Sequence, residues 1–216
     1  MDFKTVKRIP TGHIQDKQPM SFDQIIASSS FQKWFGESKI RDAAGKPLEV
    51  YHGGLRFDSF RERPESLAHF ASDDYAIADG YADQYSRESA EIKALFLRIE
   101  NPLDLRDFDL FEKWIGLDPR QCDASSEWGI KAYMAHNNID VRSGGALLKK
   151  ARLAGHDGVI FFDTDVRNRS LHTSYAFFEP EQAKLALGID ATLNHYKVRQ
   201  YIGNGQFDPG SPQLDR

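Results

Sequence analysis

The chain has a single cysteine, Cys122, among 216 residues. One cysteine cannot form an internal disulfide or supply a cysteine-rich zinc site, so a reducing compartment is expected. An excess of basic residues is also lacking, because 28 Lys and Arg stand against 32 Asp and Glu, for a formal net charge of −4. This balance excludes a general basic surface for nucleic acid or anionic membranes, although a local patch could still hold nucleic acid as a substrate.

Long apolar runs are also missing. The N-terminus has no basic start followed by an apolar stretch of roughly 7–15 residues, and no later segment approaches the roughly 20 apolar residues that span a bilayer. The sequence therefore predicts a cytoplasmic protein with no membrane partner.

Several catalytic motifs are absent as well. The seven histidines show no HExxH or Cys/His spacing, so no metal site is predicted. The glycine pairs at 53–54 and 144–145 lack the spacing of a GxGxxG or Walker loop, and no GxSxG elbow occurs. These absences argue against zinc hydrolases, P-loop enzymes and α/β-hydrolases.

What is present suits one globular domain, since 40% of the residues are hydrophobic. No internal repeat is visible, and we expect a polar lead-in, a single domain and a polar tail, at 1–20, 21–202 and 203–216. Apolar spacing and capping residues predict helices over 22–35, 73–84 and 144–153, within a mainly helical middle at 107–154. Strands are predicted over 48–52, 91–100, 159–162 and 175–178. The predicted fold is α+β with a small split or mixed sheet.

The most informative segment is the strand that stops at His52 and is followed by Gly53 and Gly54. Glycine has no Cβ, so a flat ligand could approach the peptide groups at this strand end closely. A histidine at such a place can equally be a hydrogen-bonded structural residue. Both interpretations stay open from this segment alone.

Five short segments stand out in the sequence, at 31–48, 51–53, 70–81, 155–160 and 174–182. Taken in this order, they resemble the ADP-ribosyltransferase superfamily, which includes diphtheria toxin and the poly-ADP-ribose polymerases. The resemblance is closest to the transferase-like domains of phage polyvalent proteins. It implies an ADP-ribosyltransferase-like sheet with flanking helices, NAD as co-substrate, a macromolecular acceptor that is protein rather than nucleic acid, and the host cytosol as location if the protein is phage-encoded or delivered.

The resemblance also assigns roles to residues. His52 matches the histidine that hydrogen-bonds the ribose, and the main chain of Gly53 would hold the nicotinamide carboxamide. Tyr81 matches the tyrosine that stacks on the cationic nicotinamide ring, a contact worth about 0.5–2 kcal/mol. The alternative for Tyr81 is an amphipathic helix residue that packs on the core. His69 stands where the polymerases carry a second tyrosine, so either His69 or Phe70 would supply the second wall.

The expected carboxylate is the point of departure from the family pattern. Ser174 stands at the position of the family glutamate, and serine carries no negative charge. Glu179 is the leading replacement, although strand alternation turns it to the face opposite Ser174. Glu181, Asp163 and Asp165 are further candidates, and the two glutamates could instead be solvated charges.

The sequence therefore predicts an NAD-dependent mono-ADP-ribosyltransferase of phage or effector type, with His52, Tyr81 and Glu179 as catalytic residues. Arg167 and Arg169 could contact the NAD phosphates. One alternative, motivated by Ser174, is a catalytically weak or inactive NAD-binding or protein-binding module of the same fold. Another is an RNA 2′-phosphotransferase, against which the weak basic character argues. The NAD-binding residues are expected to be Tyr51, His52, Gly53, His69, Phe70, Ser72, Tyr81 and Ser174.

Overall fold

The computed structural model describes residues 22–56, 59–61, 68–85, 89–123, 125–138, 145–165 and 170–186. The predicted lead-in at 1–20, the tail at 203–216 and the two loop arginines, Arg167 and Arg169, lie outside the described residues.

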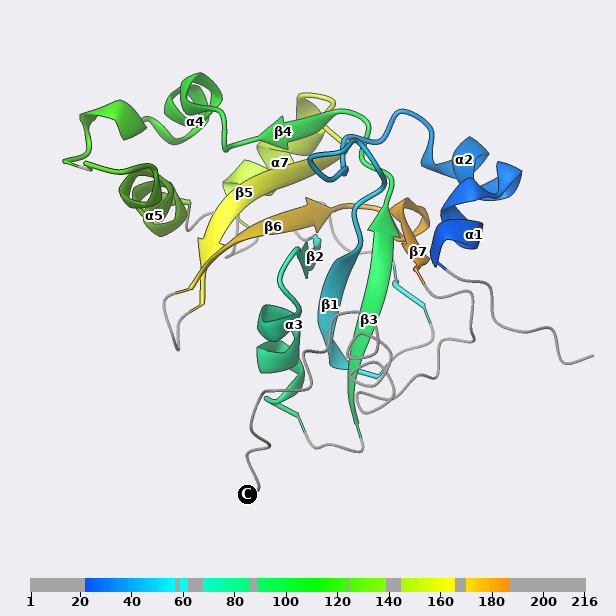
Figure 1. The fold of residues 1–216 in the computed structure, drawn as a ribbon. Coiled ribbons are helices and arrows are strands. Elements are labelled where there is room, and N and C mark those ends of the chain that lie inside the picture. The colour runs from blue at the N-terminus through cyan, green and yellow to red at the C-terminus, as the bar shows by residue number, and fades with distance from the viewer. Residues whose placement is uncertain are drawn as a thin grey trace, which may run out of the picture.

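The described chain forms one mixed seven-stranded sheet, in the order β4-β5-β6-β2-β1-β3-β7 (Figure 1). β4 runs parallel to β5, and every other neighbouring pair is antiparallel. With its flanking helices, this sheet confirms the predicted α+β fold. The strands are β1 (Val50–Leu55), β2 (His69–Ser72), β3 (Ala90–Leu97), β4 (Pro102–Asp104), β5 (Gly158–Thr164), β6 (Leu171–Phe177) and β7 (Ala183–Leu185).

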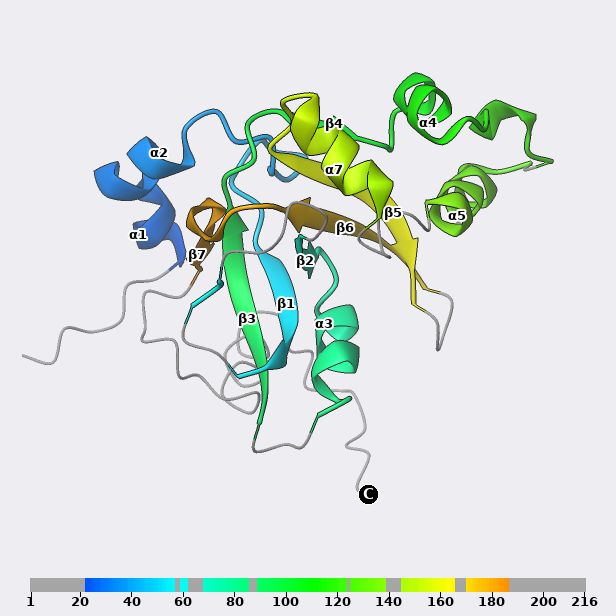
Figure 2. The same ribbon diagram turned by 180° about the vertical axis from the view of Figure 1, so that it is seen from behind.

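The helices cover different parts of the sheet. α1 and α2 lie at the β7 end, α4 and α5 at the opposite end, and α7 lies over β5 (Figures 1 and 2). α3 packs against β1, and its Asp74 cap accepts a hydrogen bond from the Ala76 N–H. The helices are α1 (Phe22–Ala27), α2 (Ser29–Phe35), α3 (Tyr75–Ala82), α4 (Phe108–Ile115), α5 (Glu127–Asn137) and α7 (Ala146–Leu153), with 3₁₀ turns η1 (Pro119–Gln121) and η2 (Pro180–Gln182).

The single helix predicted over 22–35 is wrong, because the chain breaks at Ser28. The backbone of Ser28 is extended, with φ −67° and ψ 139°. Its hydroxyl accepts a hydrogen bond from the Phe31 N–H at 3.2 Å and donates one to the Ile25 carbonyl at 2.8 Å. A serine oxygen that bonds nearby backbone in this way competes with the helical ladder. Two short helices result, and α2 packs Phe31 against Phe96 of β3.

The prediction that the first strand stops at His52 is also wrong. β1 continues through both glycines to Leu55 and pairs with β3 along its whole length. On its other side, β1 is registered with β2 only through Tyr51 and Ser72. The glycine pair therefore lies within a strand that pairs with β3 along its whole length and with β2 at one registered position.

Two hydrophobic clusters fill the space on the two sides of the sheet. One joins Phe161 and Ala176 to Leu148 of α7 and Met134 of α5. The other contains residues of alternate parity on the same strands, such as Ile160 and Phe177, together with Val50 and Leu95. Both clusters pack on β5 and β6, whereas the backbones of β1 and β2 share a single registered pair.

Candidate functional site

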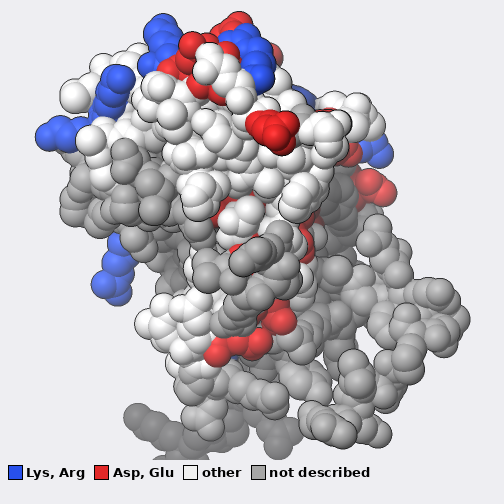
Figure 3. Space-filling model, turned by 90° about the vertical axis from the view of Figure 1, so that its left-hand side faces the viewer, with Lys and Arg blue, Asp and Glu red and all other residues white. Residues whose placement is uncertain are grey.

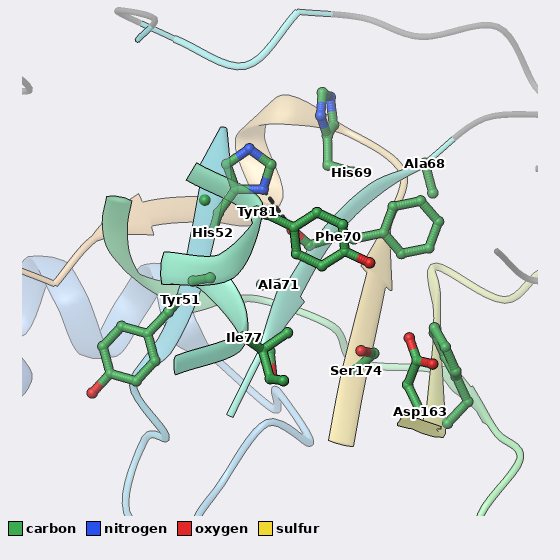
Figure 4. A pocket seen from close by; sticks show the side chains of 14 residues that line it. Tyr51, His52, Ala68, His69, Phe70, Ala71, Ile77, Tyr81, Asp163 and Ser174 are labelled. Carbon is green, nitrogen blue, oxygen red and sulfur yellow. Dashed lines mark hydrogen bonds between the residues drawn. The ribbon is translucent and has the colours of Figure 1, made fainter. Parts of the chain in front are cut away.

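A cavity of about 270 Å³ lies at the joint between β1 and β2 (Figure 4). It is lined from β1, β2, β5, β6 and α3. All eight residues predicted to bind NAD contribute to this lining, although they are spread over 124 positions from first to last: Tyr51, His52, Gly53, His69, Phe70, Ser72, Tyr81 and Ser174.

Gly53 faces the cavity with main chain only, because it has no side chain. Its lack of a Cβ serves helix packing as well. A Cβ at Gly53 would stand 1.7 Å from the Ala78 carbonyl oxygen of α3. Glycine at this position is what allows α3 to lie directly on β1, and α3 in turn forms one side of the cavity.

His52 makes the contacts of a hydrogen-bonded structural residue and also lines the cavity. Its Nδ1 donates a hydrogen bond to the Phe70 carbonyl oxygen at 2.6 Å, because a carbonyl can only accept. The ring also makes an edge contact with Phe60, with the centroids 5.2 Å apart. These contacts fix the ring orientation and place a proton on Nδ1. In the neutral ring Nε2 is then the acceptor.

Two aromatic rings, Tyr81 and Phe70, stand beside the cavity. Tyr81 is 47% exposed, so it is not the core-packing helix residue that was the alternative. In Figure 4 its ring lies between His52 and Phe70. The ring of His69 points away from the cavity floor in the same view.

His69 belongs to the cavity lining, but its ring packs against other residues. Its Nε2 donates to the Arg61 carbonyl oxygen at 2.9 Å, and its ring stacks on Phe177 with an interplanar angle of 30°. The residue is only 4% exposed. Of the two residues considered for the second aromatic wall, Phe70 is therefore the one that the geometry favours.

The hydroxyl of Tyr51 also points away from the cavity (Figure 4). It donates to Glu49 Oε1 at 2.9 Å, and the ring meets the edge of Tyr75. Burial and the neighbouring Glu49 carboxylate raise the pKa of Tyr51. Burial also raises the pKa of Glu49, and the hydrogen bond from Tyr51 partly opposes this shift. Tyr51 therefore forms part of the cavity wall and contributes no hydroxyl to its interior.

The floor of the cavity is polar and buried. Ser72 and Ser174 are cross-strand partners, 3% and 6% exposed, and Ser72 Oγ accepts a hydrogen bond from the Asp74 N–H. Asp163 reaches the same floor from β5 and is 4% exposed. Within the described lining, Asp163 is the one carboxylate, and Lys and Arg are absent.

Glu179, predicted as the catalytic acid, does not line this cavity. It precedes η2 and lines a separate open depression, together with Glu181. Arg152 Nη1 donates to Glu179 Oε1 at 3.0 Å. The cause is that β6 ends at Phe177, so Glu179 lies beyond the strand that carries Ser174 and serves as the N-cap of η2. Asp165 is not part of the cavity lining either.

The surface charge is mixed over the end of the molecule that carries α4 and α5. Seen from this side, most Lys and Arg side chains gather at the upper end, whereas Asp and Glu also show near the middle of the face (Figure 3). No group of three or more potential metal ligands occurs among the described residues. Likewise, no helix in the described ranges is long and apolar enough to cross a bilayer.

The fold and this cavity define a transferase-like domain of the ADP-ribosyltransferase class. The chain belongs to the family described as ADP-ribosyltransferase in polyvalent proteins, whose model matches residues 42–192. This confirms the resemblance seen in the sequence. No curated protein and no solved structure matches the chain. Family membership supports a transferase that generally takes NAD as substrate and a macromolecule as acceptor.

Proposed function

We propose that this chain transfers ADP-ribose from NAD to a macromolecular acceptor, protein rather than nucleic acid. The observation that carries the proposal is convergence on one cavity. The resemblance assigns His52 and Gly53 of β1 and Tyr81 of α3 to NAD, and all three line the same space. The cytoplasm, or the host cytosol for a phage-encoded or delivered protein, is the compartment that we propose, because the lone Cys122 is a free thiol.

The nicotinamide end of NAD fits this cavity chemically. Its carboxamide is both a donor and an acceptor, which the peptide groups at Gly53 complement. Its cationic ring would lie against Tyr81 and Phe70, and a good contact with an aromatic face is worth about 0.5–2 kcal/mol. The volume of about 270 Å³ is slightly below the roughly 300–1,000 Å³ typical of drug-sized ligands. We therefore place the nicotinamide and its ribose inside and the ADP part outside.

His52 would fix the ribose. Its Nδ1 proton is directed at the Phe70 carbonyl oxygen, so Nε2 of the neutral ring is suited to accept a hydrogen bond from a ribose hydroxyl. Because the ring is already oriented by the Phe70 bond and by Phe60, binding would cost little side-chain entropy. A misplaced ribose would lose the geometry needed for attack.

The reaction breaks the bond between ribose C1′ and the nicotinamide nitrogen, and the electron pair leaves with nicotinamide, which becomes neutral. A nucleophilic atom of the acceptor forms the new bond to C1′ and loses its proton. Positive charge develops on the ribose in the transition state. The polar floor, which is shielded from bulk water, is where an oriented negative group would stabilise that charge most effectively.

The deciding experiment uses NAD labelled in the adenylate part together with a whole-cell lysate. Nicotinamide release and label on macromolecules are both measured for wild type and for His52→Asn. Asparagine can keep a donor near the Nδ1 position for the Phe70 carbonyl, but it lacks Nε2. We expect the variant to lose about 10²-fold or more of the turnover at an unchanged melting temperature. Undiminished turnover would refute the assignment of this site.

The same experiment separates the alternatives. Nicotinamide release without label transfer would indicate a glycohydrolase. A binding module, which the serine at position 174 motivates, would show a thermal shift with NAD and no release of nicotinamide. For free ligand at 100 times its Kd, such binding adds about 2.7 kcal/mol to the free energy of unfolding. The absence of both a thermal shift and nicotinamide release would contradict the transferase and the binding module alike.

A further inference from the structure

A buried carboxylate and a buried histidine face each other at the floor of the cavity. Asp163 of β5 and His172 of β6 are direct cross-strand partners. Their side chains are only 6% and 3% exposed, and His172 Nε2 lies 3.8 Å from Asp163 Oδ2. Asp163 lines the cavity, whereas His172 is not part of the described lining.

The sheet register relates Asp163 to Ser174. Phe161 of β5 is the cross-strand partner of Ser174, and Asp163 lies two residues further along the same face. Asp163 and Ser174 are therefore diagonal neighbours, whose Cα atoms are typically about 7–8 Å apart. A negative charge on Asp163 therefore lies close to the part of the cavity next to Ser174. Figure 4 shows both side chains on one side of the cavity.

We propose that Asp163 is the catalytic carboxylate of this site and that His172 is its positioning residue. The inference rests on the proposed ADP-ribosyl transfer and identifies the group that stabilises the oxocarbenium-like ribose. As the C1′–nitrogen bond breaks and the electron pair leaves with nicotinamide, the Asp163 carboxylate faces the growing positive charge. No bond to Asp163 forms.

The carboxylate has a neighbour at each oxygen, a backbone donor at one and His172 at the other. Oδ1 accepts a hydrogen bond from the Thr164 N–H at 2.7 Å. Oδ2 faces His172 Nε2, which orients it when that nitrogen carries a proton, although 3.8 Å is too long for a hydrogen bond. A carboxylate fixed in this way needs little reorganisation when charge develops.

A buried histidine at position 172 is unfavourable for stability if its role is only structural. Its Nδ1 is buried and has no hydrogen-bond partner among the described residues. A buried polar atom without a partner destabilises the folded state, whereas an apolar side chain of similar size would avoid that loss. The cost is understandable if Nε2 is needed opposite Asp163.

The test compares four variants for nicotinamide release, with kcat and KM measured separately, and for melting temperature. Asp163→Asn keeps the size of the side chain and can still accept from Thr164, but it removes the charge. His172→Gln keeps a donor near the Nε2 position, and His172→Leu removes it. Asp23→Asn, at an exposed position in the first turn of α1, is the matched control for a lost carboxylate.

We expect Asp163→Asn to lower kcat about 10²–10³-fold, with Asp23→Asn at the wild-type value. His172→Leu should lower kcat about 10–100-fold at a nearly constant KM, and His172→Gln should restore most of it. A kcat for Asp163→Asn within threefold of wild type would overturn the inference, as would equal kcat values for the two His172 variants. If wild type itself releases no nicotinamide, the proposed function fails and this inference fails with it.

Discussion

Replacing Gly53 by alanine tests whether the contact between β1 and α3 builds the cavity. The added Cβ would stand 1.7 Å from the Ala78 carbonyl oxygen and 2.6 Å from its carbonyl carbon. Both atoms belong to the helix backbone, which cannot move aside as a flexible side chain can. The substitution therefore forces α3 away from β1, and Tyr81 moves with the helix.

The size of the effect follows from this overlap. Ordinary Cβ contacts begin near 3.4 Å, so the difference from 1.7 Å requires the two elements to separate by about 1.7 Å. Overpacking of a well-packed interior typically costs about 1–3 kcal/mol, and a clash of backbone with Cβ belongs at the upper end. Since 1 kcal/mol corresponds to roughly 2–4 °C in a domain of this size, we expect the melting temperature to fall by about 6–12 °C.

Gly54→Ala provides the matched control. A Cβ at Gly54 meets only His52 Nε2, at an ordinary 3.6 Å, and lies in the same strand. Thermal unfolding followed by circular dichroism measures both variants under the same conditions. If Gly53→Ala melts within about 2 °C of Gly54→Ala, α3 does not depend on this close approach and the structural reasoning is refuted.

Two further predictions concern the cavity wall and its surroundings. Tyr81→Leu should raise KM for NAD several-fold while Tyr81→Phe stays close to wild type, because an aromatic face is what binds the cationic ring; equal KM values in the two variants would argue against stacking. Glu49→Gln should raise the melting temperature at pH 7, and the gain should shrink as the pH falls towards 4. The pKa of Glu49 is raised in the folded protein, so the folded state favours the protonated carboxyl, and the stability that this gives at low pH is lost as the pH rises through the folded-state pKa. Exposed Glu37→Gln is the control, and a gain that does not depend on pH would contradict the reasoning.

The sequence predicted those elements whose signals are local. The apolar runs of β5 and β6 are recognisable because buried strands are continuous in hydrophobicity. α3 is recognisable because acidic residues precede it, and Asp74 is its N-cap. β4 and β7 were missed, since three-residue strands exist only through the partner that pairs with them. β1 was predicted too short, because its continuation past Gly53 depends on the distant residues of β3.

The candidate site likewise contains residues that local sequence motifs predict and residues that they do not. Residues in short ordered motifs, such as His52 and Tyr81, could be assembled by resemblance, and they do line one cavity. The carboxylate could not be chosen locally, because the choice between Glu179 and Asp163 depends on the register between β5 and β6. The seven histidines show no metal-ligand spacing in the sequence, and the place of His172 opposite Asp163 becomes visible only when its cross-strand partner is known.

The single registered pair between β1 and β2 gives the sheet a seam. On one side stand β1, β3 and β7, and on the other β2, β6, β5 and β4. The cavity sits across this seam, with Gly53 on one panel and Phe70 and Ser174 on the other. A bound molecule that touches both parts of the sheet would add contacts between two groups of strands whose backbones share a single registered pair. Binding at the site would therefore also stabilise the association of these two groups of strands.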